Sequence, residues 1–173
     1  MTAQNKNKYI KLQGFTLIEL LVVIGILAIL LAITLIAINP ARQFGLANDT
    51  KRRSDATELL NAIGQYAADP ANSGQLPPAL SVATSSAATE INSASFGGAN
   101  NLCSELVTTY ISALPVDPSQ STGNTSPNSE SAGITSCTAG WDTGYQIEKD
   151  ASNRITILAP QAYAGATAIS VTR

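Results

Sequence analysis

The sequence contains no histidine, and it has few aromatic residues, at 5% of the chain. The missing histidine excludes Ser-His-Asp and Cys-His catalysis, histidine-ligated zinc and the usual general base at neutral pH. The sequence also has no G-x-S-x-G elbow, no phosphate-binding P-loop and no dinucleotide fingerprint. We therefore expect neither an enzyme nor a bound cofactor.

Charge is also scarce, because 13% of the 173 residues are charged and the formal net charge is -2. Binding to nucleic acid requires a basic surface, and this balance gives no reason to expect direct binding of that kind. The one short basic run is Lys51-Arg52-Arg53. We expect it to lie on a solvated or inter-subunit face and to pair with Asp49 and Asp55.

The apolar residues, 45% of the chain, are concentrated in a block from Phe15 to Ile38 whose single charge is Glu19. As a helix rising about 1.5 Å per residue, this block would reach roughly 36 Å, which is enough to cross a hydrocarbon core of about 30 Å. Residues 1–13 carry lysines and no acidic residue. We therefore expect the amino terminus in the cytoplasm and the chain beyond the block outside.

Two residues do not fit an ordinary membrane anchor. Gly14 stands at the junction between the basic leader and the apolar block, and Glu19 lies inside the block. A carboxylate within a membrane span costs on the order of 2.5–3.5 kcal/mol on insertion scales. Either Glu19 snorkels to the nearby interface, or it is functional and needs a partner.

The stretch from Gly14 to Val23, Gly-Phe-Thr-Leu-Ile-Glu-Leu-Leu-Val-Val, resembles the class III signal sequence of type IV pilins and type II secretion pseudopilins. The resemblance is close over residues 8–45. It implies that a prepilin peptidase cuts after Gly14 and N-methylates Phe15, the new amino terminus. It also implies that Glu19 acts in inter-subunit assembly by pairing with the terminal amine of a neighbouring subunit.

The function implied by this resemblance is that of a pilin, a structural subunit of a type IV pilus-like extracellular filament. Such a subunit would lie in the cytoplasmic membrane before assembly and in a cell-surface filament afterwards. Its implied partners are identical subunits in a helical homopolymer, the prepilin peptidase, the assembly platform and minor pilins. The alternatives are the major pseudopilin of a type II secretion system and, in another class, a single-pass membrane-anchored adhesin or binding module that does not polymerise.

The expected fold is α+β, with a long amino-terminal helix packed on a small antiparallel sheet with long loops. Pro40 is a candidate position for a kink in this helix or for melting on assembly, because proline removes a helical hydrogen bond. Gly25 is a second candidate by its resemblance to the glycine in the helix of major pilins, which stands later in their sequence. The predicted segments are a cleaved leader (1–14), a membrane-spanning or filament-core helix (15–38), the amphipathic half of the same helix (39–69) and a globular head (70–173) with a loop region (70–140) and a sheet (144–172).

Local patterns predict the elements of the head. An apolar stripe with i, i+3, i+4, i+7 spacing predicts one buried helix face, formed by Ala56, Leu59, Leu60, Ile63 and either Tyr66 or Ala67. Two alternating runs predict a hairpin around the turn 150–153, and residues 168–172 predict a third strand. A short helix is expected over residues 102–113. The Leu-Pro-x-Asp-Pro turn and the Gly-Tyr hairpin also resemble the heads of major pseudopilins and related pilins.

The two cysteines, Cys103 and Cys137, lie outside the membrane under this topology, where disulfides persist. Pairing them closes a loop of about 35 residues, which the chain-entropy model values at about 4 kcal/mol; two buried free thiols are the alternative. Asp117, Asp142 and Asp150 are weak candidates for a calcium site of the kind that some pseudopilin heads hold. No EF-hand spacing is present, and scattered solvated acids are the alternative.

Overall fold

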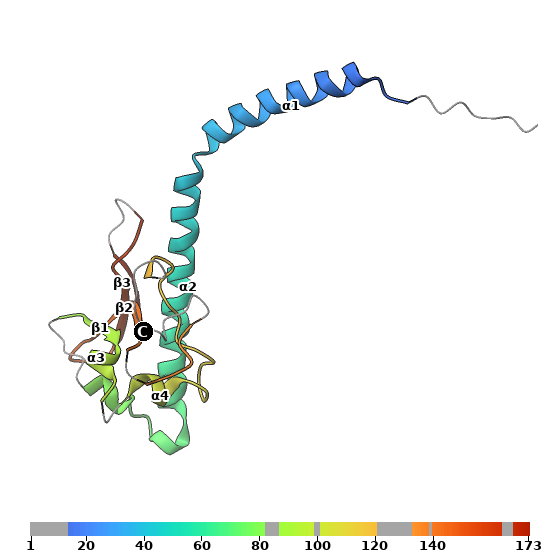
Figure 1. Cartoon of the computed structure of the whole chain (residues 1–173). Coiled ribbons are helices and arrows are strands. Elements are labelled where there is room, and N and C mark those ends of the chain that lie inside the picture. Colours follow the sequence, from blue (N-terminus) through green and yellow to red (C-terminus); the bar gives the residue numbers. More distant parts are fainter. Residues whose placement is uncertain (1–13, 82–86, 99–100, 121–132, 139, 164–167) are drawn as a thin grey trace, which may run out of the picture. The chain divides into compact units, whose positions relative to one another are not determined.

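The computed structural model describes residues 14–81, 87–98, 101–120, 133–138, 140–163 and 168–173 (Figure 1). Contacts divide the chain into two compact units, the anchor unit Met1–Gln43 and the head unit Phe44–Arg173. The chain is α+β, with a long apolar amino-terminal helix and an antiparallel sheet of four strands, as the sequence predicts. Most of the expected leader, residues 1–13, lies outside the described residues.

Helix α1 (Leu17–Ile38) forms most of the described anchor unit and runs without interruption through Gly25. None of its residues is buried within the chain. It is the one helix in the described part of the chain that is long and apolar enough to span a membrane, by length and composition. The expected membrane-spanning segment therefore coincides with a single helix.

The two halves of the expected long helix are separate helices, and the break falls next to the candidate kink residue Pro40, at Asn39. This residue adopts the left-handed conformation, with φ 46° and ψ 80°, which asparagine tolerates better than most residues. Pro40 has no backbone N–H and disfavours α conformation in the residue before it. It begins α2 (Pro40–Ala68) instead, at a position where the missing N–H is not needed. The Asn39 side chain accepts a hydrogen bond from the Arg42 N–H at 3.4 Å and so caps the second helix.

The part of α2 that lies in the head unit presents one buried face to the sheet. The predicted stripe is confirmed, because Ala56, Leu59, Leu60 and Ile63 are all buried and Tyr66 packs half-buried against the same core. Arg52 and Asp55 are buried on the same face, about two turns and one turn before the stripe's centre. The basic run therefore does not lie wholly on a solvated face, which corrects that part of the prediction.

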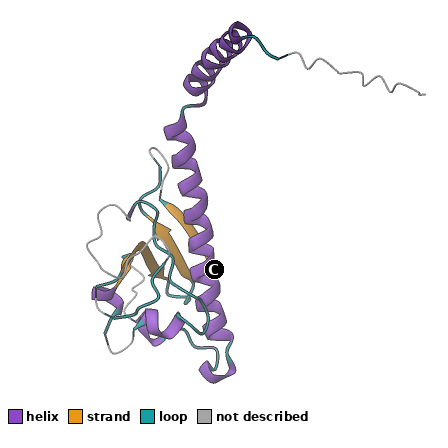
Figure 2. Ribbon diagram, turned by 45° about the vertical axis from the view of Figure 1, so that its right-hand side comes forward, coloured by secondary structure: helices purple, strands orange, loops and turns teal. Residues whose placement is uncertain are grey.

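The sheet is fully antiparallel and has the order β1-β2-β3-β4. The predicted hairpin is confirmed, with Asp150 N–H donating to the Arg154 carbonyl and Asn153 at φ 61° in the turn. Along β2 and β3 the buried residues alternate with half-exposed ones, as a sheet with one covered face requires. Figure 2 shows the strands beside α2 in the head unit. Their bounds are β1 Thr89–Asn92, β2 Asp142–Lys149, β3 Ile155–Ala159 and β4 Ile169–Thr172.

The segment expected to be mainly loop contains more structure than the sequence indicates. Strand β1 lies within it and pairs with β2 across an irregularity between Glu90 and Asn92. The helix expected over residues 102–113 is much shorter, because Val107 is extended and Thr108 has φ 75°. The remaining elements are the 3-10 helices η1 (Pro70–Asn72) and η2 (Pro78–Ser81) and the helices α3 (Ser93–Phe96) and α4 (Leu102–Leu106).

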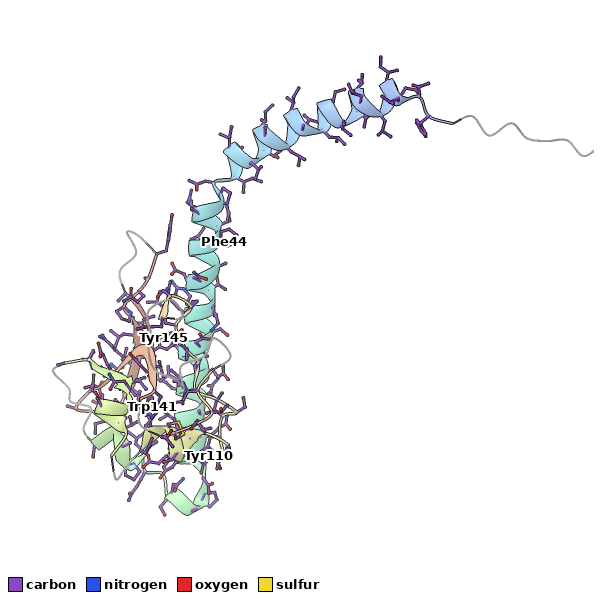
Figure 3. All side chains as sticks on the ribbon, viewed as in Figure 1. Phe44, Tyr110, Trp141 and Tyr145 are labelled. Atoms are coloured by element: carbon purple, nitrogen blue, oxygen red, sulfur yellow. A yellow bond between two sulfur atoms is a disulfide. The ribbon has the colours of Figure 1, made fainter. Side chains whose placement is uncertain are left out.

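One hydrophobic core joins α2, the sheet and the segments between them. Its two largest side chains are Trp141, just before β2, and Tyr145, within β2, and they are 1% and 0% exposed. Both are labelled in Figure 3. A head with this core is stabilised by its own contacts, whereas α1 has no such contacts of its own.

Candidate processing and assembly site

The expected cleavage position lies just before α1 begins. Gly14, Phe15 and Thr16 are all exposed and outside regular secondary structure, and Thr16 is the N-cap of the helix. No heavy atom lies within 4 Å of a Cβ placed on Gly14. Gly14 and Phe15 are thus both outside regular secondary structure. A protease can bind this segment in an extended conformation without first unfolding a helix.

Glu19 is held by Thr16 in a reciprocal capping box. The Thr16 N–H and Oγ1 donate to Glu19 Oε2 at 2.8 and 2.6 Å, and the Glu19 N–H donates to Thr16 Oγ1 at 3.3 Å. These bonds satisfy donors that a helix start otherwise leaves unpaired. Sequence reasoning missed this contact, although the Thr-x-x-Glu spacing just before an apolar run is its known signal.

Within the head, Arg52 and Asp117 form a buried ion pair that sequence reasoning also missed. Arg52 Nε and Nη2 donate to the two carboxylate oxygens of Asp117 at 2.7 and 3.0 Å, and the two residues are 3% and 0% exposed. Arg52 Nη1 also donates to Asp49 at 2.8 Å. Burial opposes ionisation of Asp117, but hydrogen bonds from Arg52 and Ser119 outweigh it and lower the pKa of the carboxyl.

A second buried contact joins α2 to β2. The Tyr145 hydroxyl donates to Asp55 Oδ2 at 2.8 Å, and Lys51 Nζ donates to the same oxygen at 2.6 Å. Burial, together with the neighbouring Asp55 carboxylate, raises the pKa of Tyr145 far above its ordinary value, so the phenol stays protonated. The two expected pairings of the basic run are therefore present, Lys51 with Asp55 at 2.6 Å and Arg52 with Asp49 at 2.8 Å.

Cys103 and Cys137 form a disulfide bond, as the sequence predicts. Cys103 is fully buried in α4, and the Cys137 carbonyl accepts a hydrogen bond from Asn101 at 2.8 Å. The bond thus fastens residues 133–138, which contain little secondary structure, to the helical part of the head. The alternative of two free thiols does not hold in this structure.

The three calcium candidates do not come together. Asp117 is bound to Arg52, and Asp150 caps the hairpin turn and pairs with Arg154 at 2.9 Å. Asp142 and Asp150 stand at opposite ends of β2, roughly 25 Å apart at 3.3 Å per residue. In the residues that the structure describes, no group of three Asp, Glu, Cys or His side chains could hold a metal ion.

Comparison with known proteins identifies the amino-terminal segment. Residues 11–35 match the family described as the prokaryotic N-terminal methylation motif. This is the amino-terminal segment of the type IV pilin and pseudopilin family. No curated protein and no solved structure matches the chain.

The match covers the residues around which the site is built. It includes Gly14, Phe15, Thr16 and Glu19 and most of α1. The motif implies processing by a prepilin peptidase and pilin assembly in general. The motif points to a structural protein, and the apolar α1 points to membrane anchoring before assembly. The match does not extend to the head.

Proposed function

We propose that this chain is a pilin, a structural subunit of a type IV pilus-like extracellular filament that assembles through α1. The observation that carries the proposal is the exposure of α1 in a single chain. Each of its Leu, Ile and Val side chains is more than half exposed, from 51% at Val22 and Leu27 to 84% at Ile36. Such a helix needs apolar surroundings on all sides, which a bilayer supplies first and a bundle of identical helices supplies afterwards.

In this proposal the prepilin peptidase cuts between Gly14 and Phe15 on the cytoplasmic face and methylates the new terminus. The processed subunit waits in the cytoplasmic membrane with its head outside. The assembly platform and minor pilins then move it into a homopolymer at the cell surface. Cleavage leaves a charged amine at Phe15, about one helical turn from Glu19.

Glu19 would set the register of assembly by pairing with the amine of a neighbouring subunit. The capping box offers a competing explanation, in which Glu19 acts only as a helix cap for Thr16. Glu19→Gln separates the two roles, since the amide oxygen can still accept the Thr16 hydrogen bonds but carries no charge. Thr16→Val does the reverse, because it removes the hydroxyl and keeps the carboxylate.

The experiment compares fibre yield with the membrane pool of processed subunit for these two variants and for Glu19→Val. We expect Glu19→Gln and Glu19→Val to be inserted and cleaved but to assemble poorly, while Thr16→Val still assembles. Normal fibres from Glu19→Val would refute the assembly role. Normal fibres from Glu19→Gln with failure of Thr16→Val would assign Glu19 to capping alone.

Two further measurements test processing and the kind of filament. Mass spectrometry of the surface protein should find an N-methylated Phe15 as the first residue, and Gly14→Ala should slow cleavage. Retained residues 1–14 would contradict the processing step. Electron microscopy of sheared fibres, with peptide identification, should find long fibres built mainly of this subunit. Their absence would favour the secretion pseudopilin or the anchored adhesin.

A further inference from the structure

The exposed aromatic side chains of the described head gather at one place. Phe44 is 71% exposed at the start of the head unit, and Tyr163 is 37% exposed. The ring of Tyr163 lies on Gly45, the residue after Phe44. In Figure 3, Phe44 is labelled near the start of the head part of α2, and Tyr110 is labelled near the other end of that helix. The other described aromatic residues of the head are buried or half-buried, namely Tyr66, Phe96, Tyr110, Trp141 and Tyr145.

Two contacts hold Tyr163 in this position. A Cβ on Gly45 would overlap the Tyr163 ring, so the ring can lie directly on the helix backbone because residue 45 is glycine. The Tyr163 N–H also donates to Asp49 Oδ1 at 3.0 Å, one turn further along α2. A segment that follows the end of β3 is therefore fastened to the first turns of the head's helix, with its aromatic ring still partly in solvent.

The side chains at this place surround the helix. Successive residues of an α-helix point about 100° apart, so Phe44, the Tyr163 ring on Gly45, and Leu46 cover three directions in turn. Leu46 is 45% exposed. We call Phe44, Leu46 and Tyr163 the aromatic collar. A collar of this kind fits an environment that encloses the helix better than a single flat partner.

The collar lies close to the membrane-spanning helix along the chain. Ile38 is the last residue of α1, and Phe44 follows six positions later. Those positions span about 9 Å as a helix and about 21 Å at full extension. Beyond the hydrocarbon core, the headgroup region of each leaflet is roughly 5–8 Å thick. Aromatic rings favour this interface, and Arg42 can reach lipid phosphates from the intervening turn.

We propose that the aromatic collar is a membrane-interface anchor that contacts the lipid headgroup region on the outer side of the membrane while the subunit awaits assembly. This inference rests on the proposed membrane-anchored pilin. The collar would fix how far the head stands from the bilayer and would have to leave the lipid when the subunit enters a filament. Its ligand is a phospholipid surface.

The test uses the processed full-length chain in phospholipid vesicles whose lipids carry bromine near the headgroup or deep in the acyl chain. Tryptophan is introduced as Phe44→Trp or Tyr163→Trp, and Gln65→Trp serves as the control because Gln65 is exposed about 32 Å further along α2. Ile29→Trp reports insertion of α1. Native Trp141, 1% exposed, gives a constant background and reports that the head is folded.

We expect headgroup-brominated lipid to quench Phe44→Trp and Tyr163→Trp at least about two-fold more than Gln65→Trp, with deep bromine acting mainly on Ile29→Trp. Adding Gly45→Ala should displace residue 163 and remove most of the quenching of Tyr163→Trp, while the quenching of Phe44→Trp stays unchanged.

Equal quenching of Phe44→Trp and Gln65→Trp, with Ile29→Trp quenched, would overturn the collar alone. Absence of quenching of Ile29→Trp would overturn membrane anchoring and the collar together. A spectral shift of Phe44→Trp that follows protein concentration and not bromine would identify a second copy as the occupant and overturn the lipid contact.

Discussion

Replacing Asp117 with asparagine should strongly destabilise the head. Arg52 is 3% exposed and gives two of its N–H groups to Asp117, so the substitution leaves a buried guanidinium without its main counter-charge. Breaking a buried ion pair by removing one partner costs about 3–5 kcal/mol. Asp49 remains 2.8 Å from Arg52 Nη1. We therefore expect a loss near the lower end, about 3 kcal/mol in the free energy of unfolding.

The assay is urea unfolding of the full-length chain in detergent micelles, followed by fluorescence of Trp141, the single tryptophan. Asp150→Asn is the matched control, because Asp150 and Arg154 form an exposed pair in which 38% and 68% of the side chains are accessible. An exposed pair is worth about 0–1 kcal/mol, so the control should change little. A loss below about 1 kcal/mol for Asp117→Asn would refute the importance of the buried pair.

The effect of pH gives an independent check on the same pair. Although burial opposes ionisation, hydrogen bonds from Arg52 and Ser119 lower the pKa of Asp117 in the folded state. A lowered carboxyl pKa stabilises the fold above the unfolded pKa of about 3.9, and this contribution is lost as pH falls toward the folded pKa. The difference in stability between the wild type and Asp117→Asn should thus be constant near neutral pH and shrink below about pH 4. A difference that persists unchanged at pH 3 would contradict the assignment.

Three further substitutions probe other contacts in the same unfolding assay. Cys103→Ser should cost about 2–5 kcal/mol, and reductant should lower the wild type to a similar stability; a wild type insensitive to reductant would contradict this. Tyr145→Phe should cost about 1–3 kcal/mol because buried Asp55 loses a hydrogen-bond donor, whereas Tyr66→Phe, which keeps its ring contact with Tyr110, should cost less. Gly144→Ala should cost about 1–3 kcal/mol, because φ is 73° and the new Cβ would overlap Gln120. Gly98→Ala, with nothing within 4 Å of its Cβ, is the control, and equal losses for the two would refute the steric argument.

The elements that the sequence predicts well are those with a sustained period. The apolar block, the stripe from Ala56 to Ile63 and the alternating runs around the 150–153 turn each repeat over several residues, so a single buried face or span explains them. Strand β1 has four residues in a segment rich in serine and alanine, and pairing with β2 holds it in place. A short element fixed by a distant partner leaves no periodic trace.

The site shows the same division between local and distant information. The glycine, the phenylalanine and Glu19 stand at fixed spacing within a few residues, and so does the Thr16 cap, which the same spacing could have predicted. The pair of Arg52 and Asp117 joins residues 65 positions apart. Arg52 lies four residues before Ala56 and so shares the helical phase of the buried stripe, and this spacing could have predicted that Arg52 is buried. Nothing in the local sequence names Asp117 as its partner.

The carboxylates of Asp117, in the head unit, and Glu19, in the anchor unit, differ in whether their own chain supplies a counter-charge. Asp117 receives a cation from its own chain, so its burial contributes to the folding of one head. Glu19 receives hydrogen bonds from Thr16, which is neutral, and these bonds satisfy oxygen lone pairs without balancing the charge. Arg42, the basic residue in the described part of the anchor unit, lies 23 positions further along the chain, beyond the end of α1. In the proposed assembly, the counter-charge for Glu19 would be the amine that cleavage after Gly14 creates. In the proposed filament that amine belongs to a neighbour, so the type of electrostatic pairing that stabilises one head would join one subunit to the next.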